Sequence, residues 1–162
     1  MPSLKKQLDQ SHLKAIRGSF LDFIDDPFYG SEIDSVRYLA DGLLVLADGK
    51  IRAFGPFDEL QSEYGEIPTT TYPGRLIMPG FIDTHIHYPQ TEMIAAYGEQ
   101  LLEWLNNYTF PTEHKFEDKA YARKVAEFFL DELLRNGTTT ALVFACVYPQ
   151  SVDAFFEAAE RR

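Results

Sequence analysis

One segment, Pro79–Gln90 with the sequence PGFIDTHIHYPQ, constrains this chain more than any other. An apolar, β-forming run leads into His85 and His87, and a strand alternates its side chains between two faces, so both imidazoles leave the same face. Neutral imidazole is a ligand for zinc, iron or nickel, and such a metal lowers the pKa of a bound water to about 7. The segment therefore predicts half of a metal site, with His85 and His87 as ligands.

The two residues that close this segment add a second chemical feature. Pro89 has no N–H to donate, so the strand should end before it. Gln90 follows, and its carboxamide both donates and accepts hydrogen bonds, which suits recognition of a polar heterocycle. A bare His-X-His pair also occurs on solvated or half-buried strand faces that bind nothing. The residues alone leave that alternative open.

The segment resembles the motif that opens the barrel in the amidohydrolase superfamily. Within that superfamily, three stretches are similar to the guanine deaminase family: His85–Gln90 (HIHYPQ), Ala96–Leu105 (AYGEQLLEWL) and Thr109–Glu113 (TFPTE). The β-rich N-terminal part and Asn136–Thr140 also fit, so the resemblance covers nearly the whole chain. It implies hydrolytic deamination of guanine to xanthine and ammonia, in which a metal-activated water attacks C2 and a glutamate moves the proton.

The resemblance also implies roles for individual residues. His85 and His87 would bind a divalent metal, most simply zinc, with iron as the alternative. Further histidine and aspartate ligands and the proton-shuttling glutamate would lie beyond Arg162, and the full-length form would be a homodimer. From the residues alone, Trp104, the only tryptophan, would usually pack in the core, whereas the resemblance implies that it borders the purine site and stacks on the ligand. The residues that the resemblance assigns to guanine binding are Gln90, Trp104 and Leu105.

Other polar residues near this motif have simpler interpretations. Asp83 shares the strand face of His85, and a buried carboxylate satisfied by bonds to the backbone or to groups around the metal ligands is favoured over a third metal ligand. His114 lies in a polar stretch and is expected at the surface. The single Cys146 cannot form an intrachain disulfide and is expected to be a small buried hydrophobe. Glu99 and Glu103 are expected to be solvated charges.

The chain is short for the fold that its motif implies. A (β/α)8 barrel takes about 200 residues or more, so the residues after Pro79 suffice for about two βα units. We expect an α/β chain in which residues 1–78 form part of a small β-sandwich and residues 79–162 begin an amidohydrolase barrel. Such a chain would be an N-terminal fragment or a truncated product. On its own it should be inactive and prone to aggregate through open strand edges.

Alternation and helical spacing predict the individual elements. A polar connector is expected over Ser62–Thr71. Asn136-Gly137 should end the helix expected over Glu117–Arg135. The expected strands are Leu13–Phe23, Val36–Leu46, Lys50–Gly55 after a turn at Asp48-Gly49, and Thr138–Cys146. The expected helices are Glu92–Asn106, Glu117–Arg135 and Ser151–Arg162. The apolar side chains expected to be uncovered are Phe128, Phe129, Leu142 and Phe144.

Charge and hydropathy limit the possible partners. The sequence carries 15 Lys and Arg against 25 Asp and Glu, and the net charge of −10 disfavours nucleic acid or an anionic membrane as a partner. No apolar run approaches the ~20 residues of a transmembrane helix, and no signal peptide is seen, so a cytoplasmic location is expected. Two alternatives stay open: another purine, pyrimidine or triazine aminohydrolase, or a non-catalytic chain that binds metal weakly or acts as an interaction module.

Overall fold

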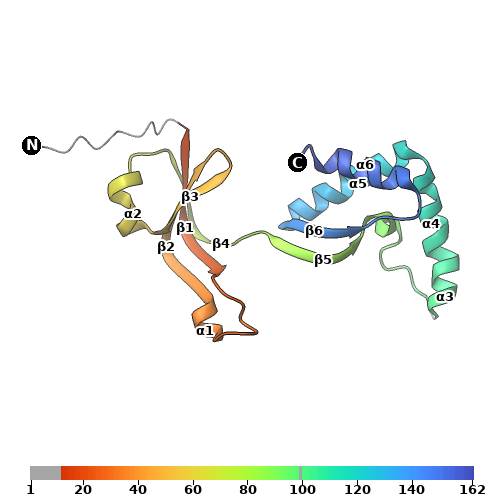
Figure 1. Cartoon of the computed structure of the whole chain (residues 1–162), viewed down its shortest axis with the longest axis horizontal. Helices are drawn as coiled ribbons and strands as arrows, with labels where there is room; N and C mark the ends of the chain where they lie inside the picture. Colours follow the sequence, from red (N-terminus) through yellow and green to blue (C-terminus); the bar gives the residue numbers. More distant parts are fainter. Residues whose placement is uncertain (1–11, 99) are drawn as a thin grey trace, which may run out of the picture. The chain divides into compact units, whose positions relative to one another are not determined.

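The computed structural model describes residues 12–98 and 100–162. The chain divides into two compact units, a first unit over Met1–Pro79 and a second unit over Gly80–Arg162 (Figure 1). Within the described ranges, no helix is long and apolar enough to span a membrane.

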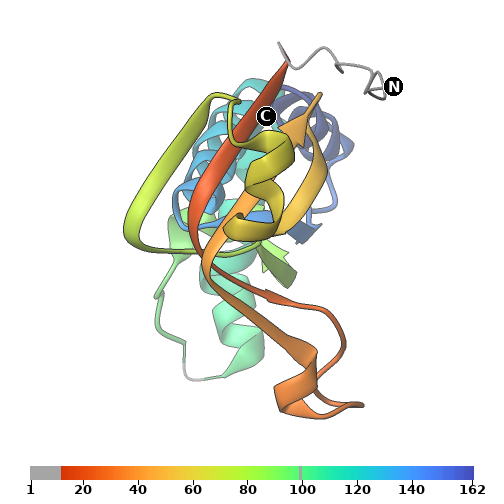
Figure 2. The same ribbon diagram turned by 90° about the vertical axis from the view of Figure 1, so that its left-hand side faces the viewer.

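A four-stranded sheet forms the first unit, with the strand order β3-β2-β1-β4 (Figure 2). Strand β2 pairs antiparallel with both β1 and β3, whereas β4 pairs parallel with β1. The turn between β2 and β3 has positive φ at Asp48 (50°) and Gly49 (74°), the combination that a tight hairpin requires. The three predicted strands and the hairpin are confirmed. The strand bounds are β1 Leu13–Phe23, β2 Val36–Ala47, β3 Lys50–Pro56 and β4 Thr69–Ile77.

The core of the first unit lies between this sheet and a short helix. Alternating residues of β1 and β2 point into it, and helix α2, Phe57–Tyr64, packs over them. The predicted polar connector at Ser62–Thr71 is wrong, because α2 extends to Tyr64 and β4 begins at Thr69. The stretch is polar in composition, but it contains Tyr64 and Ile67, which are buried in the core and hold this part of the chain against the sheet. The buried core residues are Leu13, Ala15, Leu43, Val45, Tyr64 and Ile67.

The second unit has a β-α-β order followed by a helix. Strand β5, Phe81–His87, pairs parallel with β6, Thr138–Phe144, and helix α5, Lys119–Arg135, connects them (Figure 1). The Asp118 side chain caps α5 by accepting from the Ala120 N–H at 2.8 Å. Helix α6, Pro149–Ala159, follows β6. The predicted strand after residue 137 and the predicted helix before it are confirmed, and the chain is a mixed α/β protein.

Helix α5 ends as expected at Asn136-Gly137. Gly137 has φ of 85°, the left-handed conformation that closes many helices. Its carbonyl then accepts from the Phe81 N–H at 2.8 Å, which ties the helix end to the start of β5.

The segment between β5 and α5 departs from the prediction of one helix over Glu92–Asn106. It contains short turns of different kinds because Ala95 has φ of 64°, which no helix allows, and Gln100 is extended. Tyr97 is 77% exposed, so the apolar spacing did not mark a buried face. The short elements are the 3₁₀ helix η1 Tyr88–Met93, helix α3 Leu101–Trp104, the π-helix η2 Leu105–Thr109, helix α4 Phe110–His114 and the 3₁₀ helix η3 Lys115–Glu117.

Alanines allow α5 and α6 to pack closely above the sheet, around the buried rings of Tyr88 and Phe116. Phe129 is 7% exposed, so the prediction that it is uncovered is wrong. Its neighbour on the helix, Phe128, is 57% exposed as predicted, because adjacent helical residues point about 100° apart. Leu142 and Phe144 on β6 are also exposed, as predicted.

Candidate metal centre

The two histidines of the motif meet at the carboxyl end of β5. Their Nε2 atoms lie 3.2 Å apart, and their rings leave the same face of the strand. Two nitrogens that bind one tetrahedral zinc at about 2.0–2.1 Å are separated by about 3.3 Å. The spacing of His85 and His87 therefore fits two ligands of a single metal ion.

Phe144 lies beneath this pair. It stands opposite His87 in the register of β5 and β6, and the two rings stack at 4.6 Å between centroids with an angle of 11°. The His85 ring lies 4.8 Å from the same phenyl ring. Phe144 thus restricts both imidazoles from one side. Sequence reasoning treated it only as an exposed strand residue, since the register that places it here is not visible in the sequence.

Asp83 and His114 do not complete the site. The Asp83 carboxylate accepts a hydrogen bond from the backbone N–H of His85 at 3.0 Å, so it bonds to the backbone as expected. His114 is exposed, and its Nδ1 lies 2.7 Å from the Tyr148 hydroxyl oxygen. Over residues 12–98 and 100–162, no group of three or more His, Cys, Asp and Glu side chains is placed to hold a metal ion.

Gln90 stands beside the histidines on η1. Its Nε2 lies 3.2 Å from Glu113 Oε1 and 3.5 Å from His87 Nδ1. A carboxylate only accepts, so the amide nitrogen faces Glu113. Glu113 belongs to the TFPTE motif, but sequence reasoning gave it no role of its own. Cys146 is half-buried, with its Sγ 4.0 Å from the Glu113 carbonyl oxygen.

A hollow of about 410 Å³ opens in front of these residues. Its lining combines the polar groups of His85, His87 and Gln90 with apolar side chains that include Met93 and Phe129. Planar heterocycles with polar edges match such a mixed lining.

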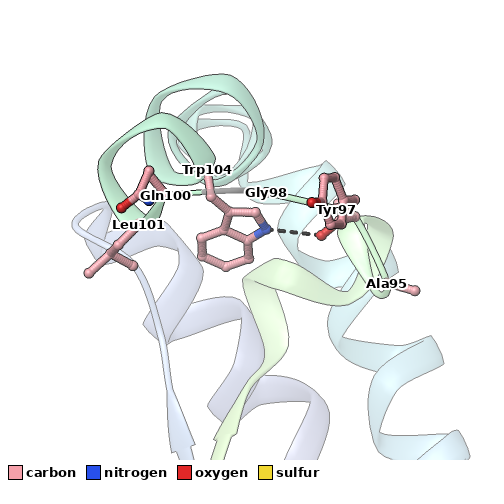
Figure 3. Close-up of a pocket in the computed structure, with 7 residues that line it drawn as sticks. Ala95, Tyr97, Gly98, Gln100, Leu101 and Trp104 are labelled. Carbon is pink, nitrogen blue, oxygen red and sulfur yellow. Dashed lines mark hydrogen bonds between the residues drawn. The ribbon is translucent and has the colours of Figure 1, made fainter.

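Trp104 lines this hollow and also a second one of about 480 Å³, which it shares with residues 95–98, Gln100 and Leu101 (Figure 3). The indole N–H donates to the Ala96 carbonyl oxygen at 3.1 Å, which leaves the ring, rather than the N–H, for contact with a ligand (Figure 3). Leu105 lines neither hollow. Glu103 is exposed as expected, and Glu99 lies outside the described residues.

A family model agrees with the part of the chain that carries this site. Residues 76–162 match the amidohydrolase family. The matched range begins just before β5 and includes both histidines.

Curated proteins and solved structures give a narrower likeness. Guanine deaminase of Escherichia coli is 58% identical over 155 residues, which is 91% of this chain and 34% of that protein, and its solved structure superposes with a TM-score of 0.85. The Bradyrhizobium japonicum guanine deaminase structure is 44% identical with a TM-score of 0.87, over 93% of this chain and 33% of the other. A Clostridium relative, guanine deaminase from C. acetobutylicum with bound guanine in its active site, is 29% identical with a TM-score of 0.74, over 92% and 34%. The chain thus spans about a third of the length of these relatives.

Proposed function

Because this chain belongs to the amidohydrolase family, we propose that it forms the first part of the active site of a guanine deaminase, which hydrolyses guanine to xanthine and ammonia. One observation carries the proposal: the histidine pair at ligand spacing opens into the same hollow as the Gln90 carboxamide. The identity of 58% with a guanine deaminase supports the choice of substrate.

His85 and His87 are the residues of this chain that would hold the metal, each through Nε2. Their imidazoles suit zinc, which we propose, and would accept iron. When bound, the metal would supply Lewis-acid chemistry that activates a water at neutral pH. Further ligands and the proton-shuttling glutamate are proposed to lie in the part of a full-length form, of the relatives' length, that this chain does not span.

Other residues in the hollow and near it bind and orient the heterocycle or the imidazoles in this proposal. Gln90 presents its amide oxygen to a substrate N–H, while the Trp104 ring closes one side of the hollow. Phe144 holds the two imidazoles in place from below. Leu105 follows Trp104 and keeps the guanine-binding role that the family resemblance implies. A homodimer and a cytoplasmic location also stay predictions.

Substituting Gln90 tests the choice of substrate. A site that hydrogen-bonds a purine loses most of its discrimination when a polar partner is removed, so Gln90→Ala in the full-length form should lower kcat/KM for guanine by about 100-fold or more. The matched control is Gln61→Ala, an exposed glutamine of α2, which should change kcat/KM by less than about twofold.

The comparison is made by measuring ammonia release with guanine, adenine and cytosine as substrates, together with xanthine formation from guanine. A full-length enzyme that deaminates adenine or cytosine but not guanine would contradict the assignment of guanine as the substrate. Equal losses of kcat/KM for guanine in Gln90→Ala and Gln61→Ala would show that Gln90 does not bind the substrate.

A further inference from the structure

We propose that Glu113 is a positioning residue that fixes the orientation of the Gln90 amide and so makes Gln90 a hydrogen-bond acceptor toward the substrate. The inference rests on the proposed function and deepens it, because it assigns the polarity with which the site contacts the heterocycle. Glu113 itself does not line the hollow beside the histidines.

The contact is part of a two-rung connection between η1 and the segment around α4. Gln90 Nε2 donates to Glu113 Oε1 at 3.2 Å, and two residues further along both segments Lys115 Nζ pairs with Glu92 Oε2 at 2.9 Å. The first rung is half-buried, whereas both side chains of the second are about half exposed. Only the first rung adjoins the histidines, so the two rungs can be tested separately.

The chemistry of Glu113 decides which end of the amide faces it. An ionised carboxylate accepts hydrogen bonds and cannot donate, so it attracts the Gln90 nitrogen and repels the Gln90 oxygen. In the described part of the chain Gln90 Oε1 has no protein partner. The oxygen is therefore available to accept an N–H from a ligand in the hollow.

Without Glu113 the opposite orientation would gain a partner. An imidazole that binds a metal through Nε2 carries its proton on Nδ1 and donates from that atom. His87 Nδ1 lies 3.5 Å from the Gln90 amide, so a rotated amide would offer its oxygen to His87. The oxygen would then be lost to the substrate. Glu113 prevents this rotation.

A double-mutant cycle between positions 90 and 113 in the full-length enzyme tests the inference. Glu113→Ala should lower kcat/KM by about tenfold in the wild-type background and by less than about twofold when Gln90→Ala is already present. Similar losses in both backgrounds would show that Glu113 does not act through Gln90 and would overturn the inference.

Two further variants separate positioning from a structural role. Glu113→Gln can accept from Gln90 but can also donate to a rotated Gln90 amide, so its kcat/KM should fall between those of wild type and Glu113→Ala. The matched control, Glu92→Gln, weakens the second rung and should leave kcat/KM within about twofold. A loss in Glu92→Gln as large as that in Glu113→Ala would mean that segment docking, and not amide orientation, is responsible.

An exchange of the two side chains covers the case in which Glu113→Ala does not fold. Q90E alone would place two carboxylates in contact and should lower kcat/KM strongly, whereas Q90E combined with E113Q restores one donor and one acceptor and should recover at least about tenfold. Failure of the double variant to recover activity would contradict the inference. Metal content should match wild type in all folded variants, because His85 and His87 are unchanged.

The cycle is measured on whichever aminoheterocycle the wild-type enzyme deaminates fastest. Absence of guanine turnover alongside turnover of another substrate would reject the proposed function. The coupling between Gln90 and Glu113 would still be measured on that second substrate, so the two failures are distinguishable.

Discussion

The two units of this chain differ in one group of polar side chains. Charged side chains pair with each other in both units, as in Arg37 with Asp22 in the first and Lys119 with Glu157 in the second. In the second unit, two imidazoles at the end of β5 have ring nitrogens 3.2 Å apart, and only one of the two can donate to the other. Oppositely charged pairs stabilise a surface, whereas two imidazoles that both present an unprotonated Nε2 to one point provide a place for a cation. The histidine pair therefore supports the proposal that the chemistry lies in the second unit.

The sheets of the two units differ as well. Four strands pair in the first unit, and its buried core residues lie under α2. The second unit has a two-stranded parallel sheet with helices over one side and large apolar side chains still exposed, among them Ile82 at 70% and Leu142 at 63%. Exposed apolar strands of this kind usually receive further protein in a complete fold. This observation supports the proposal that β5 and β6 begin a barrel.

The largest expected effect tests where the chemistry lies. In the full-length form, His85→Ala or His87→Ala should abolish retained metal and guanine turnover together, because either change removes one of the two ligands that we propose for this chain. Elemental analysis and xanthine formation measure the two losses.

The control for this prediction comes from the first unit. Asp41→Asn disrupts its exposed pair with Arg17 and should leave metal content and turnover unchanged within about twofold. Unchanged metal stoichiometry in both histidine variants would reject their ligand roles. It would also mean that the second unit is not distinguished from the first by a metal site at this histidine pair.

The second prediction concerns stability and uses two adjacent phenylalanines of α5. Phe129→Ala should lower the free energy of unfolding of the second unit by about 3–5 kcal/mol, because it opens a cavity beside Tyr88 and Phe155. Phe128→Ala, at an exposed position, should cost less than about 1 kcal/mol.

Urea unfolding of the 162-residue chain, at a protein concentration at which light scattering shows no aggregation, measures both variants through Trp104 fluorescence, because Trp104 is the only tryptophan and lies in the second unit. Equal costs for the two substitutions would show that the helix does not direct Phe129 inward.

The smallest expected effect concerns an ion pair of the first unit. The hydrogen bond from Arg37 lowers the pKa of the Asp22 carboxyl below its ordinary value. A lowered pKa in the folded state stabilises the protein above the carboxyl's unfolded pKa of about 3.9, and this stabilisation is lost as the pH falls through the folded pKa. Asp22→Asn should therefore reduce the loss of stability on acidification, by under about 1 kcal/mol for a pair this accessible.

Chemical unfolding followed by circular dichroism at pH 6 and at pH 3 measures this difference. The variant should be less stable than wild type at pH 6 and nearly equal to it at pH 3. A constant gap between the two proteins at both pH values would contradict the assigned pKa direction.

Local patterns predicted the elements whose partners are close in sequence. The hairpin of β2 and β3 follows from alternation around Asp48-Gly49, and the end of α5 follows from Gly137. The path between Met93 and Leu101 did not follow from spacing, because a positive φ at Ala95 overrides the helical pattern of its neighbours. Such backbone conformations depend on tertiary contacts, and an alanine gives no local signal of them.

The same distinction holds for the candidate site. His85 and His87 were predictable because an i, i+2 pair on one strand is a local feature. Phe144 and Glu113 were missed because they reach the site through strand pairing and through packing of α4 against η1. The register between β5 and β6 joins residues more than fifty positions apart, and a single sequence does not encode that distance in any local pattern.

Xanthine formation from guanine tests directly whether the histidine pair belongs to a metal centre that deaminates guanine. The measurement compares the full-length form, the same protein stripped of metal and then reloaded with zinc, and residues 1–162 alone. We predict turnover in the full-length form, loss on stripping, recovery with zinc, and no turnover above background for residues 1–162. Turnover that survives complete removal of metal, or measurable turnover by the 162-residue chain, would contradict the account.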